Sequence, residues 1–312
     1  MRWTQAAAMA FILASGSATA ADTFHTPEVI ATIPSPAFNE NISEDTDGTF
    51  YVTGAFESNL WKITPGGNVE KLAHFDQYPV ILGVVVLPET LVLGAFRRNF
   101  RSANGVDFSD VGSEVLMLDK TTGKIIAAIA GQKGQVFNGM VADGRGHVLL
   151  TDSLGASVWR FDPAARVLSL WLKDETLASS NAKALGANGI KVAGDWVYVA
   201  NREKLSIFRV RIDAAGKPAG PMTLFAKDLP NADDFSVASD GTVFLPPTDQ
   251  AKPSPMLRIT PSGERTAHAV GAFGASAVVS RDGKWVYWAS SRGLVPTSPA
   301  PQTLLRVPVF PR

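Results

Sequence analysis

The sequence repeats one strand–turn–strand pattern along most of its length. Each copy has a short apolar strand, an Asp/Gly turn and a second strand rich in Val, Tyr, Phe or Trp. Five copies read "NISEDTDGTFYVTG", "NGMVADGRGHVLLTDS", "NGIKVAGDWVYVAN", "DFSVASDGTVFLPP" and "SAVVSRDGKWVYWAS", and a degenerate sixth reads "GVVVLPETLVLGAF" followed by "EVLMLDKTTGKIIAAI". Such a repeat constrains the fold strongly, because each unit must bury its apolar face against its neighbours.

The spacing of the copies predicts the architecture. The residue just before each inner strand is, in order, Glu40, Gly83, Asn138, Asn188, Asp233 and Ser276, with steps of 43, 55, 50, 45 and 43 residues. Repeats of about 40–50 residues with about four strands each are typical of β-propellers. A solenoid would lack the tight hairpin in each unit, and two β-sandwiches would not need this spacing. We therefore predict an all-β fold, a six-bladed β-propeller.

The two ends of the repeat region predict how the ring closes. Residues 28–33, "EVIATI", form a strand without a partner in the first repeat, and residues 304–310, "LLRVPVF", form another after the last one. We expect the two strands to pair in the same blade, which leaves no open sheet edge. Helical periodicity is nearly absent, and only residues 174–185 could hold a helical turn or two.

Composition limits the possible partners. The chain of 312 residues has 29 basic and 29 acidic residues and a formal net charge of zero. Nothing in this balance suggests binding to nucleic acid or to acidic lipid, so we expect neither nucleic acid nor a membrane as a partner. The sequence has no cysteine, which excludes disulfides, thiolate metal sites and a cysteine nucleophile. The oligomeric state is not encoded in any pattern of the sequence.

The N-terminus resembles an export signal. A short apolar run, "AAAMAFILA", is followed by Ala18-Thr19-Ala20, which matches an A-x-A cleavage site. A buried N-terminal helix is the alternative for this run. We predict that residues 1–20 are a secretory signal peptide, that residues 21–312 form one propeller domain, and that the mature protein is secreted or periplasmic. No later segment is apolar for long enough to span a bilayer.

The residues before the inner strands form a second pattern. In a propeller these positions converge at one mouth of the central channel, and four of them carry oxygen donors: Glu40, Asn138, Asn188 and Asp233. Carboxylate and amide oxygens suit Ca²⁺ or another hard divalent cation, whereas zinc prefers His or Cys. A single Asn-Gly pair would be read as a hairpin turn. The shared position in four repeats favours a metal site instead, whereas the Asp-Gly pairs between strands are assigned to hairpins.

At these residues the sequence resembles the family of senescence marker protein, gluconolactonase and related lactonases, which includes the squid-type diisopropylfluorophosphatases. The resembling segments are "NENIS", "FNGMVADGRGHV", "ANGIKVAGDWVYVAN" and "ADDFSVASDGTVFL". The resemblance implies a six-bladed propeller with a catalytic calcium or other divalent ion held by Glu40, Asn138, Asn188 and Asp233. It also implies that Asp233 is the general base or nucleophile in the hydrolysis of a lactone or related ester.

Two departures from the family pattern bear on substrate. The family usually has Asp-Gly where this chain has Asp233-Asp234, and its sugar lactonases often have an arginine where this chain has Val136. With Phe137 next to it, Val136 favours a more apolar lactone or ester. We predict pocket roles for Val136, Phe137, Arg97 and Ser276, and a rim over the mouth formed by Arg97, Arg98, Phe96 and Phe100. A solvated loop is the alternative for that rim.

Two other classes of function stay open at this point. The first is a non-catalytic propeller that binds a ligand or partner and uses the metal as a structural plug. The second is a lyase or a strictosidine-synthase-like activity on the same scaffold. All three readings allow the ring of oxygen donors, but only hydrolysis requires an open coordination position and an ionised Asp233.

Overall fold

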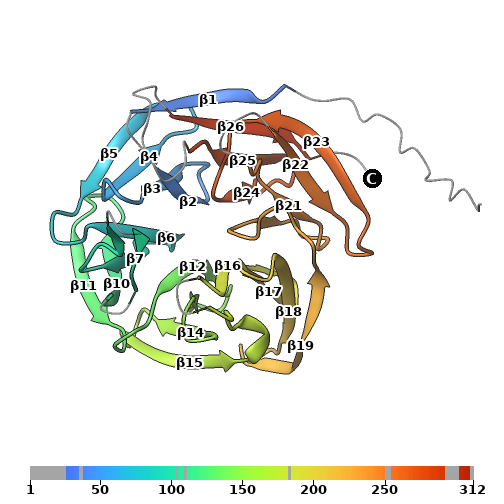
Figure 1. The fold of residues 1–312 in the computed structure, drawn as a ribbon. Helices are drawn as coiled ribbons and strands as arrows, with labels where there is room; N and C mark the ends of the chain where they lie inside the picture. The colour runs from blue at the N-terminus through green and yellow to red at the C-terminus, as the bar shows by residue number, and fades with distance from the viewer. Residues whose placement is uncertain are drawn as a thin grey trace, which may run out of the picture.

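The protein is a ring of six four-stranded antiparallel sheets around a central channel (Figure 1). The computed structural model describes residues 26–34, 38–102, 105–108, 111–181, 184–249, 254–291 and 302–309. Within these ranges the only helix is a 3₁₀ turn, Glu175–Leu177, and no helix is long and apolar enough to cross a membrane. The predicted all-β, six-bladed propeller is therefore confirmed. The predicted signal peptide, residues 1–20, lies outside the described residues.

The first three blades follow the chain in order. Blade 1 consists of β2 (Asn39–Glu44), β3 (Phe50–Gly54), β4 (Asn59–Ile63) and β5 (Val69–His74). Blade 2 consists of β6 (Val80–Val86), β7 (Thr90–Phe96), β10 (Ser113–Asp119) and β11 (Ile125–Ala130). Blade 3 consists of β12 (Phe137–Ala142), β13 (Val148–Asp152), β14 (Ser157–Asp162) and β15 (Val167–Lys173).

The last three blades complete the ring. Blade 4 consists of β16 (Ala187–Ala193), β17 (Trp196–Asn201), β18 (Ser206–Ile212) and β19 (Pro218–Ala226). Blade 5 consists of β20 (Ser236–Val237), β21 (Val243–Leu245), β22 (Ser254–Ile259) and β23 (Arg265–Gly271). Blade 6 consists of β24 (Ala277–Val279), β25 (Trp285–Ala289), β26 (Gln302–Pro308) and β1 (Glu28–Ile33). A small extra hairpin of β8 (Arg101–Ser102) and β9 (Gly105–Val106) leaves blade 2.

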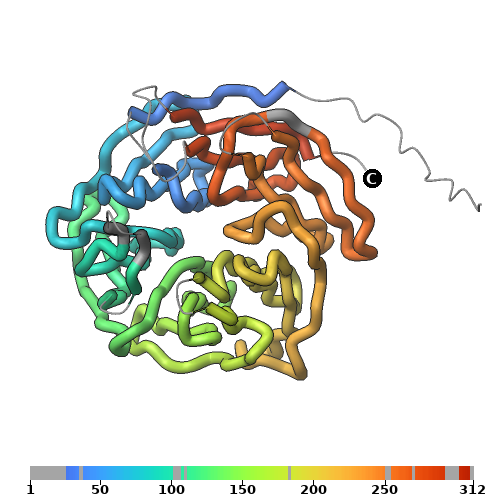
Figure 2. The backbone as a smooth tube through the Cα atoms, viewed as in Figure 1, coloured from blue at the N-terminus to red at the C-terminus, as the bar shows by residue number. Residues whose placement is uncertain are grey.

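The ring closes in blade 6. Strand β1, from the start of the propeller, pairs antiparallel with β26 from its end, with Glu28 opposite Arg306 and Ile33 opposite Gln302. Figure 2 shows the blue start of the chain lying along the red end. This is the predicted pairing, and the physical reason is that a closed ring satisfies the backbone groups that an open sheet edge would expose.

Tight turns join the two inner strands of each repeat, as the Asp-Gly pairs predict. In blade 1 the Asp47 carboxylate accepts a hydrogen bond from the Thr49 backbone N–H at 2.9 Å, and Gly48 has a φ of 82°. Blade 5 repeats the arrangement, with Asp240 and Thr242 at 2.9 Å. Glycine suits this position because a residue with a Cβ is strained at positive φ.

The inner strands are irregular where they begin. The pairing register shifts between Asn39 and Asn41 in β2, between Phe137 and Met140 in β12, and between Ala187 and Ile190 in β16. A β-bulge of this kind re-aims a side chain that regular pleating would direct into the sheet. The bulges therefore fall on the predicted oxygen donors of blades 1, 3 and 4.

The glycines after two of these donors let the blades approach one another. A Cβ on Gly139 would lie 2.4 Å from the Asn188 carbonyl oxygen, and a Cβ on Gly189 would lie 2.3 Å from Oδ1 of Asp234. Neither contact leaves room for a side chain. The Asn-Gly pairs are thus explained by close packing around the channel and not by hairpin turns.

A threonine on the second strand fixes each of two bulges to the next blade. In blade 3 the Thr151 hydroxyl accepts from the Gly139 N–H at 2.9 Å and donates to the Asn188 carbonyl at 2.5 Å. In blade 1 the Thr53 hydroxyl accepts from the Asn41 N–H at 3.0 Å and donates to a backbone carbonyl of blade 2 at 2.6 Å. These bonds set the angular position of the neighbouring inner strands.

Candidate functional site

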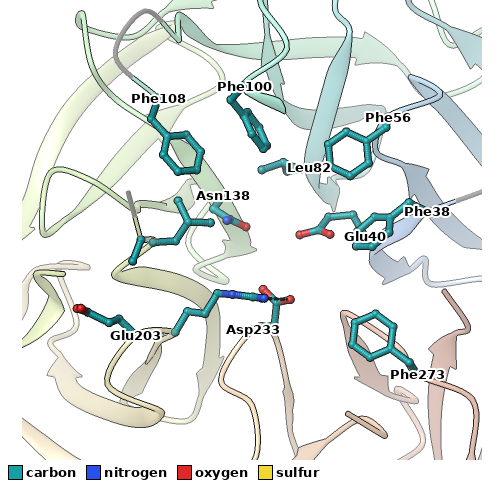
Figure 3. Close-up of a pocket in the computed structure, with 13 residues that line it drawn as sticks. Phe38, Glu40, Phe56, Leu82, Phe100, Phe108, Asn138, Glu203, Asp233 and Phe273 are labelled. Carbon is teal, nitrogen blue, oxygen red and sulfur yellow. Dashed lines mark ion pairs between the residues drawn. The ribbon is translucent and has the colours of Figure 1, made fainter. Parts of the chain in front are cut away.

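The predicted donors lie together at one mouth of the channel. Glu40, Asn138 and Asp233 line a cavity of about 310 Å³, and Asn188 donates a hydrogen bond from Nδ2 to Oδ1 of Asp233 at 2.9 Å. Figure 3 shows the side chains of Glu40, Asn138 and Asp233 pointing toward one another across the polar end of the cavity. Residues from blades 1, 3, 4 and 5 meet here because the repeat places them at equivalent points around the ring.

Two members of this set have no hydrogen-bond partner. Asn138 is 5% exposed, Glu40 is partly buried, and no hydrogen bond joins either side chain to the rest of the described chain. Buried polar groups in native proteins are almost always satisfied by protein, water or a ligand. The amide of Asn138 and the carboxyl group of Glu40 are therefore open to water or to a ligand at this end of the cavity.

The other two members are engaged with each other and with an arginine. Asp233 receives the Asn188 amide on Oδ1 and pairs through Oδ2 with the Nη1 group of Arg202. The side chain of Asp233 is 9% exposed and that of Arg202 is 38% exposed, so the guanidinium reaches the carboxylate from the open side of the site. The nearby Asp233 carboxylate raises the pKa of Arg202.

The environment of Glu40 opposes its ionisation. Burial, chiefly, and then the nearby Asp233 carboxylate raise the pKa of Glu40 to about 8, against the smaller opposite effect of Arg202. Desolvation disfavours the charged form of a carboxyl, and a like charge nearby adds to the effect. In the metal-free protein, then, Glu40 holds its proton at neutral pH.

A second carboxylate centre lies directly below the first. Asp234 accepts hydrogen bonds from Lys191 Nζ at 2.8 and 2.7 Å, from Asn41 Nδ2 at 3.0 Å and from Ser276 Oγ at 2.6 Å. Its side chain is 6% exposed and that of Lys191 is 15% exposed. This centre is buried and is held by hydrogen bonds from Lys191, Asn41 and Ser276.

Apart from Arg202 and Glu203, the rest of the cavity is apolar. Its wall contains five phenylalanines and three aliphatic residues: Phe38, Phe56, Phe100, Phe108, Phe273, Leu82, Leu185 and Ala184. Four of the rings form a continuous series, with centroids 5.3 Å apart for Phe38 and Phe56, 6.1 Å for Phe56 and Phe100, and 5.0 Å for Phe100 and Phe108. Figure 3 shows these rings on one side of the polar groups, with Phe273 on another side. An apolar wall with a few polar groups at one end is the usual lining of a small-molecule site.

Two long intervals in the repeat supply part of this wall. The step of 55 residues between Gly83 and Asn138 contains the segment that carries Phe100 and Phe108. The step of 50 residues between Asn138 and Asn188 contains Leu185. The extra length relative to the 43-residue steps thus builds the cavity, as is common for loops on a rigid scaffold.

The four predicted pocket residues do not line the cavity. Arg97 pairs with Glu114, its Nε lying 2.5 Å from Oε1, and stacks over Tyr78 with 5.2 Å between Cζ and the ring centroid. Val136 is fully buried behind the phenylalanine wall, and Phe137 packs on the far side of its strand among the core residues of blades 2 and 3. Ser276 faces Asp234. The apolar character expected from Val136 and Phe137 is supplied instead by the phenylalanine rings.

Arg202 is the polar residue that the sequence pattern did not single out. It directly follows β17, and its backbone N–H donates to the Gly186 carbonyl at 2.9 Å, just as Ser153 donates to Val136 in blade 3 and Ala55 to Phe38 in blade 1. Each acceptor stands two residues before a predicted donor. In these three blades the residue after the second strand therefore lies close to a predicted donor. A charged residue at this position of the repeat is the sequence signal that could have identified Arg202.

The donor set suits a divalent cation in its chemistry. Glu40 and Asn138 present unpartnered oxygen-bearing groups to the cavity, and Asn188 and Asp233 complete two carboxylates and two amides, a set typical of calcium. In the described part of the chain no three His, Cys, Asp or Glu side chains gather in a metal-binding group, which agrees with a set that depends on amides. The residues fit a hard cation provided that Arg202 releases Asp233.

Comparison with known proteins supports the fold. No family model and no curated protein sequence matches the chain. Among solved structures, a calcium-binding protein, regucalcin, from Agrobacterium tumefaciens matches with a TM-score of 0.66 and 15% identity, over 93% of this chain and 96% of that one. A gluconolactonase from Xanthomonas campestris matches with a TM-score of 0.64 and 13% identity, over 89% of each chain.

The similar structures also include a different reaction class. Virginiamycin B lyase from Staphylococcus aureus matches with a TM-score of 0.56 and 12% identity, over 88% of this chain and 97% of that one. At such identities a structural likeness establishes architecture and leaves the reaction to the residues of the site. The chain is a six-bladed propeller of the architecture that regucalcin-like and gluconolactonase-like proteins share.

Proposed function

We propose that this protein is a hydrolase of an apolar lactone or related ester. The observation that supports the proposal is the pair of unpartnered side chains, Glu40 and Asn138, which face the same cavity as the Asp233 carboxylate. Polar groups that converge at one end of an otherwise apolar cavity are the usual arrangement of a small-molecule site. The substrate's acyl or alkyl part lies along the phenylalanine wall and brings its carbonyl to the polar end.

A divalent cation, calcium in the first instance, would be held by Glu40, Asn138, Asn188 and Asp233. When bound there it would polarise the substrate carbonyl as a Lewis acid. The bulges of β2, β12 and β16 aim the first three of these side chains into the mouth, and the Thr151 hydroxyl holds the strands of Asn138 and Asn188 in register. The scaffold thus fixes the backbone positions of these donors.

Asp233 is the group we assign to the chemical step, as general base or as nucleophile. As a base it takes a proton from water while the water oxygen bonds to the carbonyl carbon. The ester C–O bond then breaks, and the leaving oxygen takes up a proton. Before a cation binds, the Asn188 amide holds the Asp233 carboxylate at this end of the cavity by a hydrogen bond of 2.9 Å. The wall of phenyl rings excludes competing water from the substrate's apolar part.

The proposal is tested by hydrolysis of aryl esters and lactones of increasing acyl length, with added calcium and with chelator. Asp233→Asn is expected to lower kcat/KM by at least about 100-fold, the usual contribution of a positioned base. Asp228→Asn is the matched control, because it removes an exposed carboxylate whose side chain is 80% exposed. Absence of activity on every compound, in a protein that still binds calcium, would contradict the proposal.

A non-catalytic binding propeller is the second candidate. The Arg202–Asp233 ion pair favours it, because the pair engages the carboxylate that hydrolysis requires. Under this alternative, apolar esters and their carboxylate products bind with similar affinity, and no turnover is measured with or without calcium. Under the hydrolase proposal the wild-type protein turns the esters over and Asp233→Asn binds them without turnover.

Export is proposed separately, on the N-terminal sequence alone. The apolar run and the Ala18-Thr19-Ala20 site predict a mature N-terminus at or near Ala21. N-terminal sequencing of protein recovered outside the cytoplasm tests this. An intact Met1 in exported material would contradict it.

A further inference from the structure

We infer that Arg202 is a resident cation of this centre, which holds Asp233 in the metal-free protein and competes with a divalent cation for it. The inference deepens the proposed function, on whose metal site it rests. The observation that supports the inference is that only two of the four donors are engaged by other groups of the protein. Glu40 and Asn138 are unpartnered, whereas Asp233 is paired with the guanidinium and with the Asn188 amide.

The competition follows from the way Asp233 is bonded. One of its oxygens receives the Asn188 Nδ2 group and the other receives Arg202 Nη1, so both carboxylate oxygens are already in use. A divalent cation needs at least one of them as a ligand and needs the Asn188 oxygen, not its NH₂ group, turned inward. Binding of the cation therefore turns the Asn188 amide over, and it displaces Arg202 because the guanidinium and the cation would otherwise lie against the same carboxylate.

The charges at this end of the channel point the same way. With Glu40 ionised, as a cation ligand must be, the region holds three carboxylates and two cations: Glu40, Asp233, Asp234, Arg202 and Lys191. Their sum is −1. A divalent cation would change the sum to +1 while Arg202 remains in place, whereas a site without Arg202 has a charge of −2, which a divalent cation neutralises. Like charges in a buried site repel strongly, so the guanidinium and the metal exclude each other.

Arg202 is placed so that it can leave. Its backbone is fixed by the hydrogen bond to the Gly186 carbonyl, but its side chain lines the cavity and is 38% exposed. Lys191, by contrast, is enclosed with Asp234 and is 15% exposed. A long side chain with a fixed base and a solvated path is suited to exchange between an ion pair and water.

Calcium binding without substrate tests the inference. Calcium is titrated calorimetrically into the wild-type protein and into Arg202→Gln, and thermal unfolding of each is followed in chelator and in calcium. The wild-type Kd is expected to be weaker than about 10⁻⁴ M, outside the range of calcium sensors. Arg202→Gln is expected to bind at least about tenfold more tightly. The Tm of Arg202→Gln in chelator should also be lower than that of wild type, and added calcium should raise it by more.

Two further variants separate competition from a structural role. Arg202→Lys keeps the charge, so its calcium affinity is expected to stay close to that of wild type. Lys204→Gln removes a charge from the same turn, but its ammonium faces the Glu175 and Thr176 carbonyls at 3.0 Å and not Asp233. Its calcium affinity is expected to be unchanged. A merely structural Arg202 would leave all four proteins with the same calcium affinity.

Three outcomes would overturn the inference. They are tight, micromolar calcium binding by the wild-type protein, equal affinities for wild type and Arg202→Gln, and absence of calcium binding by both. The first is measured on wild type alone and so does not depend on whether a variant folds. The hydrolase proposal fails separately, because an inactive protein can still show the Arg202 effect. Hydrolysis that persists in chelator, with no effect of Arg202→Gln on calcium binding, would contradict the metal site and leave the hydrolase proposal standing.

Discussion

Asp233 and Asp234 are adjacent in sequence, yet they belong to two centres of different kinds. Asp234 faces into the channel and is bonded by Lys191, Asn41 and Ser276, all of them largely buried. Asp233 faces the cavity and its cationic partner, Arg202, is 38% exposed. Both residues lie in the short segment that precedes β20, so this one segment supplies both centres.

The difference between the centres shows that burial decides whether a carboxylate stabilises the fold or is available to a ligand. A buried carboxylate with every hydrogen-bonding position filled has no capacity for a ligand, and removing its partner leaves an uncompensated charge. A carboxylate at the edge of a cavity, with a partner that reaches water, can exchange that partner for a metal or a substrate. The two centres should therefore respond differently to the same substitution.

The largest effect is expected from the lower centre. Asp234→Asn leaves the Lys191 ammonium buried without a counter-charge, so the free energy of unfolding should fall by about 3–5 kcal/mol. Asp233→Asn, the same change one residue earlier, should cost no more than about 1 kcal/mol because Arg202 can turn to solvent. Urea unfolding measures both. Equal losses would remove the distinction between an enclosed and an open centre.

A smaller effect is expected from the threonine that holds the upper centre in place. Thr151→Val removes the acceptor of the Gly139 N–H and the donor to the Asn188 carbonyl, and should cost about 1–3 kcal/mol. Thr223→Val is the control, since the Thr223 hydroxyl is exposed and bonds only at 3.2 Å. Calcium affinity should fall in the first variant alone. If urea unfolding shows no difference between the two, the interblade bond does not position the site.

The pH dependence of stability should distinguish Glu40. Its pKa is raised from 4.5 to about 8 in the folded protein, so the folded state retains a proton that the unfolded state loses. The contribution of Glu40 to the stability of the folded protein is fully present below about pH 4.5 and is lost as the pH rises toward 8. In chelator, Glu40→Gln should therefore match wild type at pH 4 and exceed it by about 1 kcal/mol or more at pH 8. Parallel pH profiles in urea unfolding would contradict the assigned burial.

The smallest effect on stability is expected from the cavity wall. Phe56→Leu removes a ring that neighbours Phe38 and Phe100 but is itself partly exposed, so unfolding should change by less than about 1 kcal/mol. KM for the longest acyl chain should rise by about tenfold, with kcat little changed, because a lost apolar contact weakens binding uniformly. Phe225→Leu, beside Tyr198 in blade 4, is the control. Equal KM values would place the substrate elsewhere.

Much of the architecture could be predicted from the repeat. The six blades follow from its period and the pairing of β1 with β26 from the two unpartnered end strands. The gathering of Glu40, Asn138 and Asp233 follows as well, because equivalent positions in a ring of similar units face the same axis. A periodic sequence encodes this arrangement without reference to any particular contact.

Side-chain placement within the blades was harder to predict. The sequence pattern places Arg97 near the mouth. In the structure its guanidinium pairs with the buried Glu114 and stacks on the Tyr78 ring, so it does not line the cavity. Val136 and Phe137 directly precede the donor Asn138. Because of the bulge at Asn138, only the Asn138 side chain lines the cavity. A one-residue change of register exchanges the two faces of a strand, and no sequence pattern here marks where the bulges fall.

By itself the sequence determined the number of blades, the closure of the ring and the common position of the oxygen donors, because these depend on period and on residue type. Only the tertiary structure decided that Asp234 is sealed by Lys191, 43 residues away, and that Arg202 reaches Asp233. It also decided that the apolar wall comes from loops of different blades. These pairings depend on the distance between segments after the ring has closed, and that distance is a property of packing and not of local pattern.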